Sequence, residues 1–136
     1  MKIAVIDSQG AGLGQAVIKK IRKEIHKDID IIALGINIEA TSKMVKAGAN
    51  AGISGERGIC SFLKSNEIDA IIAPISIICD GGTSGEISSL IPQAIFRSNC
   101  TKYILPLQKN GIYKPGTRDL HIRGMVEEII LDLQIH

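Results

Sequence analysis

The residues best suited to chemistry form a glycine-rich turn near the start of the chain. Ser8-Gln9-Gly10-Ala11-Gly12-Leu13-Gly14 directly follows the apolar run Lys2–Asp7 and directly precedes an amphipathic pattern. Glycines let backbone N–H groups approach an anion closely, and a helix N-terminus adds partial positive charge. The order of strand, glycine turn and helix therefore predicts a cradle for a phosphate group. The alternative is a tight strand–helix turn that needs glycine for packing alone.

The spacing of these glycines fits a dinucleotide-binding fingerprint only in part. Gly-x-Gly-x-x-Gly begins at Gly10 and Gly12, but Gln15 occupies its third position and Gly14 comes one residue early. The turn resembles more closely the Thr-Gly-x-x-x-Gly-x-Gly pattern of short-chain dehydrogenases, with Asp7-Ser8 where Thr-Gly stands. That family's Tyr-x-x-x-Lys pair is missing from the chain, and no Gly-Lys-Ser/Thr sequence marks a P-loop.

The residues at the end of the second apolar run would contact the ribose of a bound nucleotide, so they help to identify the cofactor. It reads Ala33-Leu34-Gly35-Ile36-Asn37, without the acidic residue that bonds the ribose 2′-hydroxyl of NAD. Asn37 either bonds a ribose or caps the following helix, with capping slightly favoured. No arginine stands there to favour the 2′-phosphate of NADP. NAD(P) or another nucleotide is a possible cofactor, and the sequence does not identify which.

A second glycine-rich segment, Cys79–Glu86, contains the only other candidates for chemistry. The hydroxyls and free amides of Gly81–Ser84 are suited to hold a phosphate or carboxylate, or else Thr83 or Ser84 only caps a helix. Glu86 or Asp80 is the candidate general base. Cys79 lacks a nearby histidine, so a half-buried structural cysteine is favoured over a nucleophile. The catalytic residues stay unknown, and the scattered histidines predict no metal site.

In open α/β sheets, ligands bind outside the carboxyl ends of the strands, where the strand order reverses. Here that point lies between Lys2–Asp7 and Ile68–Pro74. The residues expected to bind a cofactor there are Ser8, Gln9, Gly10, Gly12, Gly14, Gly35, Asn37, Ser76, Gly81, Gly82, Thr83 and Ser84.

The elements that must position these residues alternate between strands and helices. Near-continuous apolar runs predict buried parallel strands at Lys2–Asp7, Ile29–Leu34, Ala51–Ile53, Ile68–Pro74 and Lys102–Leu107. Helical patterns place Leu13, Val17, Ile21 and Ile25 on one face and recur at Glu39–Ala47, Gly55–Lys64, Glu86–Arg97 and Asp119–Gln134. The alternation predicts a three-layer α/β/α Rossmann-like sandwich, with a mainly parallel five-stranded sheet in an order near 3-2-1-4-5.

Several details of these elements are left as expectations. Pro92 predicts a kink or a late start in its helix. Ser54 is expected to cap the helix that follows it, and Asp132 to be exposed on the last helix. The irregular stretch Gln108–Arg118 is a lid, an arm used in dimerisation or a long turn.

Length and composition narrow the class of protein. One domain, 1–136, accommodates the whole pattern. The net charge of +2 and the 3% aromatic content predict no nucleic-acid partner. No apolar run is long enough to cross a bilayer, and the N-terminus lacks the pattern of a signal peptide. Three widely spaced cysteines predict no disulfide framework, so a cytoplasmic location is expected.

Five segments together resemble a family of short bacterial proteins described as a domain of unknown function. They are residues 4–14, 31–37, 46–52, 85–87 and 104–107, read as AVIDSQGAGLG, IIALGIN, KAGANAG, GEI and ILPL. The resemblance spans nearly the whole chain. It implies a Rossmann-like fold, and no established reaction, substrate or catalytic residue.

Three functions remain open on the sequence. The leading one is binding of a nucleotide or a phosphorylated small molecule at the carboxyl edge of the sheet. The second is a small-metabolite enzyme that uses Glu86 or Asp80 as its base. The third is a regulatory or assembly subunit without catalysis, acting as a homodimer.

Overall fold

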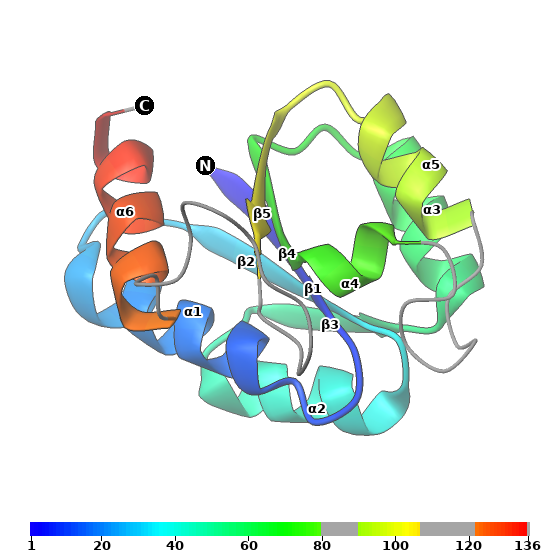
Figure 1. Ribbon diagram of the computed structural model, residues 1–136, viewed down its shortest axis with the longest axis horizontal. Coiled ribbons are helices and arrows are strands. Elements are labelled where there is room, and N and C mark those ends of the chain that lie inside the picture. Colours follow the sequence, from blue (N-terminus) through cyan, green and yellow to red (C-terminus); the bar gives the residue numbers. More distant parts are fainter. Residues whose placement is uncertain (80–89, 107–121, 136) are drawn as a thin grey trace.

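The computed structural model describes residues 1–79, 90–106 and 122–135 (Figure 1). Its strands are β1 (Lys2–Asp7), β2 (Asp30–Gly35), β3 (Ala51–Ser54), β4 (Ala70–Pro74) and β5 (Thr101–Leu105). Its helices are α1 (Gly12–Glu24), α2 (Ile38–Ala47), α3 (Glu56–Ser65), α4 (Ile75–Ile78), α5 (Leu90–Arg97) and α6 (Ile122–Ile135). The strands pair in parallel in the order β3-β2-β1-β4-β5, which confirms the predicted topology.

The central strands β1, β2 and β4 are buried on both faces of the sheet, as their unbroken apolar runs predict. The edge strands β3 and β5 are mostly exposed or half-buried, so the prediction of buried strands was wrong for these two. Ile3 and Val5 face the layer of α1, α2 and α6, whereas Ala4 and Ile6 face the layer of α3, α4 and α5. The two helical layers lie on opposite sides of the sheet in Figure 1. No helix within the described residues is long and apolar enough to cross a membrane.

One element was missed and two further expectations about these elements were wrong. The single turn α4 was not predicted, because it continues the apolar run past Pro74. Ser54 does not cap α3: Gly55 takes the N-cap position, and the Ser54 hydroxyl donates to Thr41 Oγ1 at 2.7 Å. Asp132 is half-buried rather than exposed, because its carboxylate accepts a hydrogen bond from the Tyr103 hydroxyl. Residues 86–89 and 108–118, with their predicted helix start and loop, lie outside the described residues.

Arg22 of α1 joins the turns at the amino edge of the sheet. Its guanidinium donates to Gly48 O at 2.9 Å, to Ile29 O at 2.8 Å and to Asn50 Oδ1 at 2.5 Å. The same Asn50 oxygen accepts the Ile31 amide at 2.8 Å. One planar side chain thus ties α1 to the end of α2 and to the starts of β2 and β3.

Replacing Arg22 should destabilise the fold without touching the carboxyl edge of the sheet. Arg22→Met keeps an apolar stem but removes all three hydrogen bonds, so we expect a loss of about 2–3 kcal/mol in the free energy of unfolding. Urea denaturation measures this loss. Lys23→Met is the matched control, because Lys23 is exposed and its replacement should change stability by less than about 0.5 kcal/mol. Equal losses in the two variants would contradict the role of the guanidinium.

Candidate functional site

A buried carboxylate organises the turn between β1 and α1. Asp7, only 6% exposed, ends β1. Its Oδ1 accepts the Ser8 amide at 2.8 Å, and its Oδ2 accepts the Gly14 amide at 2.7 Å. Because Gly14 is the third residue of α1, Asp7 satisfies the amide that an N-cap side chain would normally satisfy. The actual N-cap residue, Ala11, makes no side-chain hydrogen bond.

The amides just before Gly14 are left without an acceptor. The first residues of a helix have no intrahelical partner for their N–H groups. Among the described residues, nothing accepts a hydrogen bond from the amides of Gly12 or Leu13. The same holds for the amides of Gln9 and Gly10, and both of these residues are exposed. The turn therefore presents several free donors beside the positive end of the α1 dipole.

Two of the three glycines of the turn have a structural reason to be glycine, and the two reasons differ. Gly10 has a φ of +83°, which favours a residue without Cβ. At Gly14, an added Cβ would lie 2.5 Å from Met44 Sδ and 3.2 Å from Asp7 Cβ, so this glycine serves packing of α1 against α2. At Gly12, an added Cβ would meet none of the described residues within 4 Å. Of the three, only Gly12 has no reason to be glycine that the described residues supply.

The Ser8 hydroxyl adds a buried polar group to the same turn. Ser8 is 6% exposed, and its hydroxyl has no hydrogen-bond partner among the described residues. Buried hydroxyls in folded proteins almost always have a partner, so an orphaned one points to a bound water or ligand. The sequence placed Ser8 among the expected binding residues but not its burial. The role of Asp7 was not anticipated, because its partner Gly14 lies seven residues further along the chain.

The two predicted residues at the neighbouring end of β2, Gly35 and Asn37, each have a structural role. Asn37 Oδ1 accepts the Ala40 amide at 2.8 Å, so Asn37 caps α2, the alternative that the sequence slightly favoured. An added Cβ on Gly35 would lie 2.2 Å from Thr41 Oγ1 and 2.5 Å from Thr41 N. Gly35 is therefore a glycine because α2 crosses it closely.

The remaining predicted residues are only partly described. Ser76 lies half-buried on α4, directly after β4, at the same edge of the sheet as the glycine turn. Cys79 follows α4 and is exposed rather than half-buried as predicted. The other predicted ligands (Gly81, Gly82, Thr83 and Ser84) and the candidate bases (Asp80 and Glu86) lie outside the described residues. In the described part of the chain, no cluster of side chains is suited to hold a metal ion.

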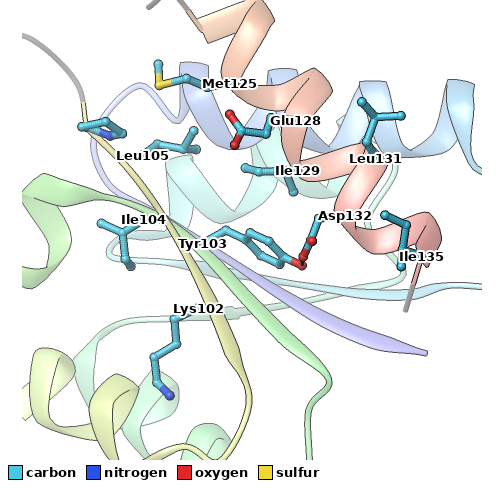
Figure 2. A pocket seen from close by; sticks show the side chains of 11 residues that line it. Lys102, Tyr103, Ile104, Leu105, Met125, Glu128, Ile129, Leu131, Asp132 and Ile135 are labelled. Carbon is cyan, nitrogen blue, oxygen red and sulfur yellow. Dashed lines mark hydrogen bonds between the residues drawn. The ribbon is translucent and has the colours of Figure 1, made fainter. Parts of the chain in front are cut away.

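A separate groove of about 640 Å³ lies between β5 and α6 (Figure 2). The Tyr103 ring reaches across it, and its hydroxyl donates to Asp132. Burial, followed by the carboxylate of Asp132, raises the pKa of Tyr103 to about 12. Two apolar side chains of α6 line the same groove and are largely exposed, Leu131 at 63% and Ile135 at 77%. Lys102 and Glu128 also line the groove, so its lining is mixed, with apolar side chains beside charged ones.

A parallel sheet in this order, with a glycine turn joining its central strand to the first helix, defines a Rossmann-like α/β protein. The family described as domain of unknown function DUF3842 matches residues 2–135, and the chain belongs to that family. This confirms the resemblance seen in the sequence. No curated protein matches the chain.

The buried state of Asp7 predicts an inverted pH dependence of stability. Burial raises the pKa of Asp7 above its ordinary value of 3.8, although the Gly14 and Ser8 amides oppose the shift. The folded protein then holds the proton more tightly than the unfolded chain. The resulting stabilisation is complete below about pH 3.8 and is lost as the pH rises through the raised pKa.

Asp7→Asn removes this titration. The free energy of unfolding of the wild type minus that of Asp7→Asn should therefore fall as the pH rises from about 4, measured by urea denaturation between about pH 3 and pH 7. Asp69→Asn is the control, because Asp69 is exposed and also accepts a backbone amide, from Lys2 at 2.7 Å. A difference for Asp7→Asn that rises with pH would contradict the prediction.

Proposed function

We propose that this protein binds a nucleotide or another phosphorylated small molecule at the carboxyl edge of its sheet. The phosphoryl group lies against the N-terminus of α1 and accepts hydrogen bonds from the amides of Gly12 and Leu13. Gln9 and Gly10 flank it with their own amides, and the Ser8 hydroxyl is the side-chain donor nearest in sequence. Ser76 of α4 stands on the opposite wall.

One observation carries this proposal: Asp7 accepts a hydrogen bond from the α1 N-terminus and still leaves two amides of that terminus without an acceptor among the described residues. Asp7 accepts the hydrogen bond of the Gly14 amide. This bond anchors the helix N-terminus, and the amides of Gly12 and Leu13 take no part in it. Gly12 is exposed, and a Cβ on it would meet none of the described residues within 4 Å, which supports access of a ligand to its amide. The arrangement supports anion binding, since the free donors and the helix dipole act at one point.

The end of β2 narrows the kind of nucleotide recognition that this site supports. The Asn37 side-chain oxygen is engaged in capping α2, and no carboxylate stands at the tip of β2 to accept the 2′-hydroxyl of a ribose. Recognition therefore depends on the phosphoryl group more than on the ribose.

Substitutions at Gly12 separate ligand binding from stability. Gly12→Val places a branched side chain over the free amides, and Gly12→Ala adds one methyl group into open space. We expect Gly12→Ala to fold with wild-type or higher stability, by up to about 1 kcal/mol, while both variants bind the phosphoryl group more weakly.

The measurement is the melting temperature with NAD, NADP, ATP, GTP, AMP, coenzyme A and inorganic phosphate. A ligand at one hundred times its Kd stabilises the fold by about 2.7 kcal/mol, which is several degrees. The control is Ser61→Val, on an exposed position of α3 away from the turn. No shift with any of these ligands, or the same shift in Gly12→Val, would reject the site.

A second candidate function is assembly into a homodimer through β5 and α6. β5 is an edge strand that pairs only with β4 among the described strands. The exposed Leu131 and Ile135 lie beside it on one face of α6. A two-fold axis through Tyr103 would pair β5 with its copy in antiparallel fashion and set Lys102 opposite Ile104, which avoids facing lysines.

Light scattering at micromolar concentration tests the assembly candidate. We expect the wild type to be a dimer and the double variant Leu131→Lys, Ile135→Lys to be a monomer, because the charges would be buried in the interface. Phe96→Lys is the control, since Phe96 is 62% exposed on α5. A monomeric wild type, or dissociation caused equally by Phe96→Lys, argues against this interface.

A further inference from the structure

We infer that the turn selects a phosphoryl group with a single negative charge, as in a phosphodiester or an internal pyrophosphate link, over a dianionic phosphate monoester. The inference rests on the proposed function and specifies the ligand class of the same site. It depends on the charges within and around the turn.

The Asp7 carboxylate and the bound anion would be held by adjacent amides. Asp7 Oδ2 accepts the Gly14 amide at 2.7 Å, and the free Leu13 amide belongs to the preceding residue. Consecutive Cα atoms lie about 3.8 Å apart, so the two negative groups are separated by roughly 5–6 Å. At that distance, in a partly buried site, each further negative charge on the ligand lowers affinity on the order of tenfold or more.

No cation among the described residues offsets the Asp7 carboxylate at this edge. The elements packed against it present Gly14 and Leu13 from α1, Met44 from α2 and Gly35 from β2, none of which is titratable. The described cation at the start of a neighbouring helix is Arg57 of α3, beyond β3. Since β3 is two strands from β1, Arg57 stands roughly 10 Å to the side.

The donors that the turn offers are neutral. They are backbone amides and the buried, unpartnered hydroxyl of Ser8. The Ser8 hydroxyl is independent of the helix N-terminus and lies in the turn, next to Asp7. Neutral donors combined with about half a positive charge from the helix dipole match one negative charge better than two when a carboxylate is adjacent.

The test compares methyl phosphate with dimethyl phosphate, which differ in charge but hardly in size. At pH 8 the monoester is a dianion, because its second pKa is about 6, whereas the diester is a monoanion. Binding is followed by NMR through the amide resonances of Gly12 and Leu13 in the ¹⁵N-labelled full chain. We expect dimethyl phosphate to bind at least about threefold more tightly to the wild type.

Asp7→Asn removes the charge and keeps one acceptor oxygen, so it should invert this order and favour methyl phosphate. Asp69→Asn, on the opposite edge of the sheet, should keep the wild-type order. A second measurement tests the inference even if Asp7→Asn folds poorly. At about pH 5 methyl phosphate is a monoanion, so the preference of the wild type for dimethyl phosphate should disappear.

The outcomes separate this inference from the proposed function. Binding of both esters with equal affinity, or tighter binding of methyl phosphate to the wild type at pH 8, overturns the charge selection and leaves the phosphate site intact. Unperturbed Gly12 and Leu13 amides with both esters, together with no thermal shift by any nucleotide, overturn the site and the selection together.

Discussion

The carboxylate of Asp7 is the constraint on which the rest of this structure depends. It is buried away from water at the end of the central strand, and hydrogen bonds from two backbone amides offset the cost of this burial. One of those amides begins α1, so the direction of the helix is fixed relative to β1. The packing of α1 on α2 at Gly14 and Met44 follows from that direction. The same direction determines that the Gly12 and Leu13 amides are the ones without an acceptor in the described part of the chain.

The atoms that hold the turn in place are different from those that the proposed ligand would contact. Asp7 joins the end of β1 to Gly14 of α1, whereas the N–H groups of Gly12 and Leu13 donate to nothing among the described residues. The groove beside β5 lies at another edge of the sheet and draws on other residues. Ligand binding at the turn and assembly at the groove are therefore compatible in a single molecule.

Local sequence patterns predicted the strands and one helix cap, but they did not predict the side-chain contacts between elements. The unbroken apolar runs predicted the central strands β1, β2 and β4, because parallel strands buried on both faces have that composition. The alternation of strands and helices predicted the strand order. The cap by Asn37 was also readable, since donor and acceptor are three residues apart. The pairing of Ser54 with Thr41 and of Tyr103 with Asp132 depends on elements that meet only after folding. The orphaned Ser8 hydroxyl was hidden for the same reason, because burial belongs to the tertiary structure.

The central place of β1 has a consequence for how the chain reaches this structure. β1 comes first in the sequence, yet Ile3, Ala4 and Val5 pair with Ala70, Ile71 and Ile72, far along the chain. Pairing over such a separation is slow to form, because a long loop must close first. During synthesis, β1 and β2 can associate early, but one edge of an apolar strand stays open until β4 emerges. Of the five strands, β1 is therefore made first, but its hydrogen bonding is completed late. The nascent chain is most prone to aggregate between the synthesis of β1 and that of β4.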